Sequence, residues 1–172
     1  MSATTPAPEA EAAAPGATAA AYDLQFLDGM SKHHQTAVEM AKMGQGKFAH
    51  AELGALAKNI VVMQESEIAQ MTQWRGQWFP GSAASGNMEM PGMESSKSMD
   101  MSHMQSMSGK ELDLMFIDMM IPHHQSAIAM SQDALAKAEH PEIKELAQKI
   151  ISDQQKEIDQ MQQWKSRWNT GK

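Results

Sequence analysis

The fold of this chain is decided by a stretch of sequence that occurs twice. Residues 23–40 read DLQFLDGMSKHHQTAVEM, and residues 113–130 read DLMFIDMMIPHHQSAIAM. The match continues without a gap at a constant offset of 90, so that residues 23–78 align with residues 113–168 and 24 of the 56 positions are identical. Six of the seven histidines fall in matched pairs, namely His33 with His123, His34 with His124 and His50 with His140. The duplication predicts two units of one kind, each with adjacent histidines beside methionines.

Each repeat has the periodicity of two amphipathic helices folded as an antiparallel hairpin. The second helix of each carries an unbroken a/d stripe. This stripe is Leu53, Ala57, Ile60, Gln64, Glu67, Met71, Trp74 and Trp78 in the first repeat and Ile143, Ala147, Ile150, Gln154, Glu157, Met161, Trp164 and Trp168 in the second. Two hairpins joined by a long crossover predict an all-α, ferritin-like four-helix bundle. Pro122 is expected to bend its helix or to mark the start of the regular part.

The chain divides into a tail and one domain. Residues 1–20 are rich in Ala, Pro and Thr and are expected to form a flexible tail. Residues 21–172 are expected to form the single four-helix-bundle domain, with repeat 1 at residues 23–78, a methionine-rich linker at residues 79–110 and repeat 2 at residues 113–168. The linker has few branched or aromatic residues to bury, so it is expected to be mobile without a ligand.

Composition excludes several classes of protein. A net charge of −7 without a basic stripe argues against nucleic-acid binding. The absence of cysteine excludes disulfides and thiolate metal sites. No run approaches the ~18 apolar residues of a membrane span. The start of the chain lacks the features of a signal peptide. It is typical of a tether left after a signal has been removed, so we expect a periplasmic or secreted protein.

The histidine pairs and their methionine neighbours are the first candidate metal site. Imidazole suits copper, zinc and nickel, whereas thioethers select Cu(I) and, by the same softness, Ag(I). The candidate ligands in the repeats are Met30, His33, His34 and Met40 in the first and Met115, Met119, Met120, His123, His124 and Met130 in the second. The alternative is that these histidines border the core and the methionines only fill it.

The linker is the second candidate site. It holds seven methionines and one histidine and contains no thiol that would compete for a soft metal. These candidate ligands are Met88, Met90, Met93, Met99, Met101, His103, Met104 and Met107. Two or three sulfurs suffice for Cu(I), and a flexible chain can wrap around such an ion. A tract that only scavenges oxidants or is merely flexible is the alternative.

Carboxylates near the histidines have two possible roles. Folding the first hairpin about residues 48–49 places His33 level with Gln64 and Met30 level with Glu67. Glu67 and its copy Glu157 are therefore expected either to accept a hydrogen bond from an imidazole or to ligate a metal. Two further sets complete the polar positions. Four aspartates are expected to interact favourably with the N-terminus of their own helix, namely Asp23, Asp28, Asp113 and Asp118. His50 and His140 are expected to be turn or cap residues.

The two copies of the motif also carry a family resemblance. Residues 116–127, FIDMMIPHHQSA, and residues 26–37, FLDGMSKHHQTA, resemble the Domain of Unknown Function 305 family. The second copy fits the pattern M-I-x-H-H-x-x-A-[IV]-x-M throughout, whereas the first has Ser31 in place of the isoleucine, so His123 and His124 are expected to matter more. The resemblance implies a ferritin-like four-helix bundle and, through the family's periplasmic copper-binding members, a role in copper resistance.

Three functions are weighed. The first is a copper-binding protein, not an enzyme, which sequesters or carries Cu(I), Cu(II) and possibly silver and exchanges it with an unidentified export or delivery partner. The second is a ferritin-like metal-dependent oxidase. No Glu-x-x-His motif occurs and each second helix has one stripe glutamate, so the carboxylates of a di-iron centre are too few. The third is a helical scaffold, which would make the repeated histidine pairs accidental.

Overall fold

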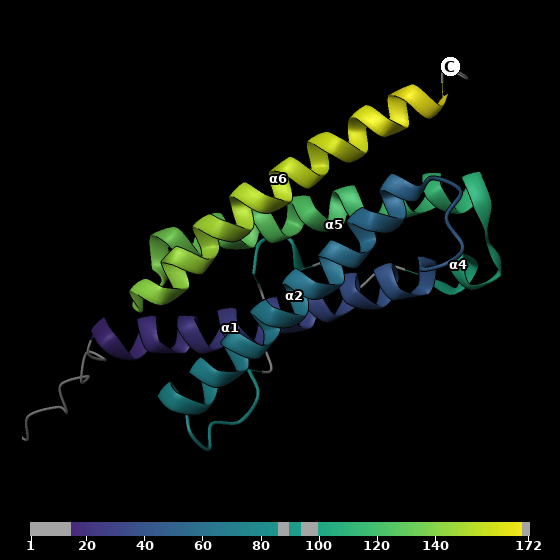
Figure 1. The fold of residues 1–172 in the computed structure, drawn as a ribbon. Coiled ribbons are helices and arrows are strands. Elements are labelled where there is room, and N and C mark those ends of the chain that lie inside the picture. The colour runs from purple at the N-terminus through teal and green to yellow at the C-terminus, as the bar shows by residue number, and fades with distance from the viewer. Residues whose placement is uncertain (1–14, 86–89, 94–99, 170–172) are drawn as a thin grey trace, which may run out of the picture.

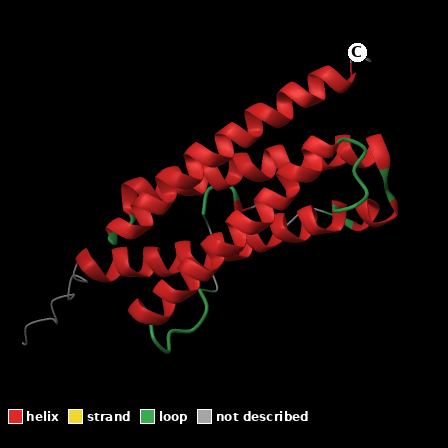
Figure 2. Cartoon of the chain, in the orientation of Figure 1, coloured by secondary structure: helices red, strands yellow, loops and turns green. Residues whose placement is uncertain are grey.

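The computed structural model describes residues 15–85, 90–93 and 100–169, with residues 15–20 described by their backbone alone. Its elements are α1 (Pro15–Gly44), α2 (Ala51–Trp78), α4 (Ser102–Ser106), α5 (Gly109–Lys137) and α6 (Pro141–Asn169). The described residues form no strand, and Figure 2 shows that the regular structure is entirely helical, with loops between the helices. No helix in this part of the chain is long and apolar enough to cross a membrane. The predicted all-α bundle of two helical hairpins with a long crossover is confirmed.

The two hairpins meet through their first helices. α1 packs against α2 within the first hairpin, α5 packs against α6 within the second, and α1 packs against α5 between them. In Figure 1, α1 and α5 run side by side, and α2 and α6 lie obliquely across them with their C-terminal ends at opposite ends of the bundle. The long crossover returns the chain to the start of α5, with the short helix α4 at the end of the bundle where α1 meets α2.

The turn between α1 and α2 depends on two glycines. Gly46 has a φ of 77°, in the left-handed region that favours glycine. A Cβ atom on Gly44 would lie 2.1 Å from Cζ of Phe48, so only glycine lets that ring close the end of the helix. The connection therefore occupies residues 45–50, and it sets which residues of α1 and α2 lie level with one another.

Two apolar cores lie along the bundle. The first core, around the α1–α2 turn and the start of α5, includes Met40, Leu53, Ile60, Phe116 and Met120. The second core, around the α5–α6 turn and the first half of α1, includes Phe26, Met30, Met71, Met130 and Ile150. Each core combines side chains from both repeats, so neither hairpin buries its apolar face alone.

Reciprocal caps join the repeats at the two ends. The carboxylate of Asp113 in α5 accepts hydrogen bonds from the backbone N–H groups of Ala49 (3.0 Å) and His50 (3.1 Å) and from Nδ1 of His50 (2.5 Å). The His50 ring stacks on Trp168 with 3.7 Å between ring centroids. His50 thus precedes α2 as its N-cap residue, as predicted for a turn or cap position.

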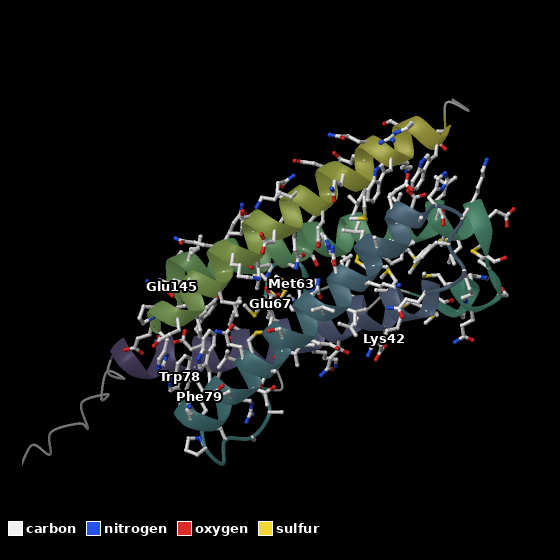
Figure 3. All side chains as sticks on the ribbon, in the orientation of Figure 1. Lys42, Met63, Glu67, Trp78, Phe79 and Glu145 are labelled. Carbon is white, nitrogen blue, oxygen red and sulfur yellow. The ribbon has the colours of Figure 1, made fainter. Side chains whose placement is uncertain are left out.

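The same arrangement recurs at the opposite end with the repeats exchanged. Asp23 accepts hydrogen bonds from the backbone of Glu139 and His140 and from Nδ1 of His140 (2.6 Å). The His140 ring stacks on Trp78 with 3.8 Å between centroids, at the end of α2 labelled in Figure 3. Each aspartate therefore caps the second helix of the other repeat.

Three sequence-based expectations need correction. Asp23 and Asp113 do not serve the N-terminus of their own helices, because α1 begins at Pro15 and α5 at Gly109. Asp28 and Asp118 pair instead with Arg75 and Lys165. α5 runs from Gly109 through Pro122, so its regular part does not start at the proline. The tail expected at residues 1–20 lies mostly outside the described residues, and α1 begins within it.

The described parts of the linker also differ from the expected mobile segment. Met90 and Met93 are buried in the second core and Met104 in the first. The cause is the unbranched thioether side chain, which fills irregular gaps where a branched residue would not fit.

Removal of a reciprocal cap should destabilise the whole domain. Asp113→Ala leaves three N–H donors at the start of α2 without their acceptor, and Asp23→Ala does the same at α6. Each should lower the free energy of unfolding by about 2–4 kcal/mol. Urea unfolding followed by circular dichroism measures this.

The matched control is Asp118→Ala. Asp118 is half exposed and pairs only with Lys165 on the surface, so its loss should cost at most about 1 kcal/mol. Equal effects of all three substitutions would contradict the capping role.

Candidate metal site: a buried histidine layer

Four histidines form a layer between the two apolar cores. His33 and His34 come from the middle of α1, and His123 and His124 from the middle of α5. Each is at most 1% exposed. Because α1 and α5 are the helices through which the hairpins meet, the histidine pairs of both repeats enter one site rather than two separate ones.

The first pair of rings is stacked. The rings of His33 and His123 lie with centroids 3.7 Å apart and planes 29° from parallel. Nε2 of His33 lies 2.5 Å from Oγ of Ser126, and that hydroxyl donates to the carbonyl oxygen of His123 at 2.8 Å. A hydroxyl has one hydrogen, so Ser126 accepts from His33. His33 therefore carries its proton on Nε2 and keeps a lone pair on Nδ1.

The other two histidines each face a carboxylate. Nε2 of His34 lies 2.8 Å from Glu67, and Nε2 of His124 lies 2.6 Å from Glu157. An ionised carboxylate only accepts, so both imidazoles donate through Nε2 and keep a lone pair on Nδ1 when neutral.

Five ring nitrogens of the layer have no hydrogen-bond partner among the residues that the structure describes. They are Nδ1 of His33, His34 and His124 and both nitrogens of His123. A buried polar atom without a partner costs about 1–3 kcal/mol, so this set is unusual in a folded core. Neutral imidazole nitrogens with free lone pairs are what copper and related metals bind.

Burial keeps the stacked pair uncharged. Loss of solvation and the neighbouring imidazoles hold the pKa of His33 well below its ordinary range and lower the pKa of His123 to about 3. Burial also opposes ionisation of Glu67, but its hydrogen bonds and charge interactions with His34 and Lys149 outweigh this and hold its pKa below the usual value. The site therefore combines a neutral stacked pair of imidazoles with an ionised Glu67.

A groove between α2 and α6 lies over this layer. It has a volume of about 720 Å³. Its lining includes Gln64, Glu67, Gln154 and Glu157, the residues of the two a/d stripes at the histidine level. Figure 3 labels Glu67 and Met63 on α2 near the middle of the bundle. The amide oxygens of Gln64 and Gln154 are buried here without a partner.

The candidate methionines surround the layer in both cores. Met30 and Met130 belong to the second core, as do Met90 and Met93 of the linker. The first core contains Met40, Met104 and Met120. Four partly buried methionines pack against it, namely Met101, Met107, Met115 and Met119. His103 is exposed, and Met88 and Met99 lie outside the described residues. Within the described ranges, no group of three or more histidine, aspartate and glutamate side chains is placed to hold a metal ion.

Two features of the site bear on the sequence analysis. Glu67 accepts a hydrogen bond from Nε2 of His34, which is one of the two roles expected for it. Sequence reasoning did not find Ser126 and Lys149. Ser126 lies three residues after His123 and so shares its helix face. Lys149 donates a hydrogen bond to Glu67 at 2.7 Å, and the equivalent residue of the first repeat is Asn59.

These features define a class of protein, a duplicated helical hairpin closed around a buried histidine layer. The chain belongs to the family described as "Domain of unknown function (DUF305)", which it matches over residues 23–165. This confirms the resemblance found in the two sequence motifs.

Solved structures of the same fold include CopM in copper- and silver-bound forms. The chain is 40% identical to CopM in the Cu(II)-bound form, with a TM-score of 0.72 over 85% of this chain and 97% of that one. It is 37% identical to the Cu(I)-bound form, with the same TM-score over 85% and 96%. A DUF305 protein of Streptomyces coelicolor is 27% identical, with a TM-score of 0.74 over 83% and 89%.

A curated relative matches over a shorter stretch. The uncharacterized protein L153 of Acanthamoeba polyphaga mimivirus is 45% identical over 49 residues. These residues are 28% of this chain, and the match spans about a third (32%) of the length of that protein.

The stacked histidines predict a loss of stability in mild acid. The unfolded chain binds protons at these residues with a pKa of about 6.5. The folded protein does not until far lower pH, about 3 for His123. Between these values the unfolded state binds more protons, so stability present above pH 6.5 is lost as the pH falls, by about 1.4 kcal/mol per pH unit and histidine.

Urea unfolding of metal-free protein at pH 7.5, 6 and 5 measures this slope. His123→Gln should reduce it by about half, whereas His103→Gln, at an exposed position, should leave it unchanged. The lowered pKa of Glu67 acts in a separate window, below a pH of about 4.5. A stability independent of pH from 7.5 to 5 would contradict neutral burial of the pair.

Proposed function

We propose that this protein binds copper as cargo, as Cu(I) and Cu(II), and also binds Ag(I). The observation that carries the proposal is the set of five ring nitrogens buried without a partner in the histidine layer. Three of these are Nδ1 atoms whose lone pairs are freed by hydrogen bonds on the opposite nitrogen. The solved copper- and silver-bound forms of CopM, at 37–40% identity, support the same choice of metal.

The donor set suits a soft ion of low coordination number. Met30 lies three and four residues before His33 and His34 on α1, and Met120 has the same relation to His123 and His124 on α5. A thioether and an imidazole at these spacings share one helix face. Cu(I) accepts two or three such donors, whereas structural Zn(II) sites almost always need four.

The linker would supply further thioethers. Met101 and Met107 are partly buried beside Met104 at one end of the bundle, with His103 exposed on the short helix between them. This cluster lies apart from the histidine layer, so we assign to it a separate capacity for Cu(I).

We assign no enzymatic activity to the protein. An oxidase of the ferritin-like type needs several carboxylates in the bundle core. The two stripe glutamates, Glu67 and Glu157, hydrogen-bond His34 and His124. This role is the expected one of acceptors that orient an imidazole and raise its basicity towards a metal.

A periplasmic or secreted location fits this chemistry. Methionine replaces cysteine throughout the chain, and thioethers cannot be lost to disulfide formation in an oxidising compartment. In such a place the protein would sequester copper or carry it to an export or delivery partner and so contribute to copper resistance.

Metal titration of metal-free protein tests the proposal. Cu(I) under anaerobic conditions should bind more tightly than Zn(II), and Fe(II) should bind weakest. Competition with a chromophoric chelator of known affinity gives each dissociation constant. Displacement of Cu(I) by Zn(II) would contradict a soft site, and oxidation of Fe(II) by O₂ with turnover would favour the oxidase instead.

Two variants should separate the histidine layer from the linker. Replacement of the seven linker methionines by leucine preserves volume, so helix content should be unchanged while Cu(I) equivalents are lost. His123→Ala with His124→Ala should instead reduce bound Cu(II), because imidazole is the better ligand for that oxidation state. His33→Ala with His34→Ala is the matched pair from the other repeat, with a smaller loss expected. Full copper binding in every variant would show that these sites are assigned wrongly.

A further inference from the structure

The two walls of the groove between α2 and α6 differ, although they are copies of one sequence. The α6 wall carries Asp153 and Lys156, and Asp153 pairs with Lys149 (3.3 Å) and Lys156 (3.5 Å). At an offset of 90, Asp153 is equivalent to Met63 of α2, Lys149 to Asn59 and Lys156 to Ser66. One wall is therefore ionic, whereas the other has exposed Val62 and Met63.

This difference reaches the two carboxylates that hold the histidines. Lys149 extends from α6 across to α2, where Nζ lies 2.7 Å from Oε1 of Glu67. The other oxygen of Glu67 accepts from His34. Glu157 accepts from His124 in the same way, but the residue equivalent to Lys149 is the uncharged Asn59. The side chain of Glu157 is also more exposed, at 18% against 8% for Glu67.

A carboxylate shared with an ammonium group is a weaker acceptor than one that serves an imidazole alone. A stronger acceptor on Nε2 makes Nδ1 of the same ring a better donor to a metal. Lys149 also places a positive charge near any cation bound by His34, and solvent screens part of this repulsion because the lysine side chain is 45% exposed. Both effects act against the His34 half of the layer.

We propose that Lys149 makes the two halves of the histidine layer unequal, so that the first soft cation is held by Nδ1 of His124 on the Glu157 side. Lys149 acts as a positioning residue through Glu67 rather than as a ligand. The proposal rests on the proposed function, because it requires that the layer bind a metal ion at all. It adds an order of filling that the near-symmetric motifs do not predict.

Silver titration followed by nuclear magnetic resonance tests this order. Ag(I) is diamagnetic, so the ¹⁵N signals of individual imidazoles remain visible while coordination shifts that of the bound nitrogen. In the unmodified protein, Nδ1 of His124 should shift at lower Ag(I) than Nδ1 of His34. Lys149→Asn introduces the residue of the other repeat and should strengthen Ag(I) binding at His34 roughly threefold to tenfold. The two signals should then shift nearly together.

Two further variants make the test specific. Asn59→Lys, the reciprocal exchange, should weaken binding at His124 by a similar factor. Lys156→Ser also removes one positive charge from the groove wall and introduces the residue of the other repeat, but Lys156 pairs with Asp153 and not with Glu67. It should leave the order of filling unchanged. Circular dichroism confirms that each variant retains its helices.

The outcomes distinguish this inference from the function on which it rests. Ag(I) that leaves all four imidazoles unshifted would refute a metal site in the histidine layer, and the order of filling with it. Ag(I) that shifts His34 first or both residues together in the unmodified protein would refute only the role of Lys149. Equal changes in the order of filling by Lys149→Asn and Lys156→Ser would also refute the role of Lys149, because the loss of any positive charge from the groove wall would then explain the effect.

Discussion

Four buried imidazoles in the middle of an apolar bundle are the constraint on which the rest of this structure depends. Buried polar groups are costly unless partners are provided, and the partners that these rings do have lie on other helices. His33 meets Ser126 across α1 and α5, His34 meets Glu67 on α2, and Glu67 continues to Lys149 on α6. Together these hydrogen bonds reach all four long helices. A slip of one helix by one residue would leave several of these atoms without partners at once.

The ends of the bundle explain why two homologous hairpins form one domain. Asp113 caps the second helix of the first repeat, and Asp23 caps the second helix of the second. The stacked pairs of His50 with Trp168 and His140 with Trp78 cross between repeats in the same way. A separate hairpin would lose its cap, its stacked tryptophan and the apolar face between α1 and α5. Duplication has therefore produced mutual dependence rather than two independent units.

Sequence periodicity predicted the fold because the a/d stripes and the repeated motif are local signals of high regularity. It also placed glutamates at the level of the histidines. It did not predict which histidine each glutamate bonds, because that choice depends on side-chain rotamers rather than on a periodic pattern. The caps in trans were missed for a related reason. An aspartate early in a repeat fits a helix start, and only the packing of α1 against α5 shows which helix start it reaches.

The linker and Lys149 show a second limit of sequence reasoning. Methionines in a Gly- and Ser-rich segment indicate a mobile tract, yet Met90, Met93 and Met104 are buried because thioether chains fill gaps that no local pattern describes. Lys149 gave no signal by itself. It becomes informative only when the repeats are compared as a pair in space, where it faces the carboxylate of the other copy.

The proposed binding of Cu(I) and Ag(I) agrees with the small number of donors that this layer brings together. Within the described residues, histidine, aspartate and glutamate side chains do not gather in threes as a prearranged metal site. A tetrahedral zinc site needs such a group, whereas a linear or trigonal Cu(I) or Ag(I) ion needs only two or three donors. For the proposed function, a lone pair on Nδ1 and a thioether three or four residues away on the same helix face would meet that lower demand. Met30 lies in one flanking core and Met120 in the other, so each histidine pair would have a thioether of its own.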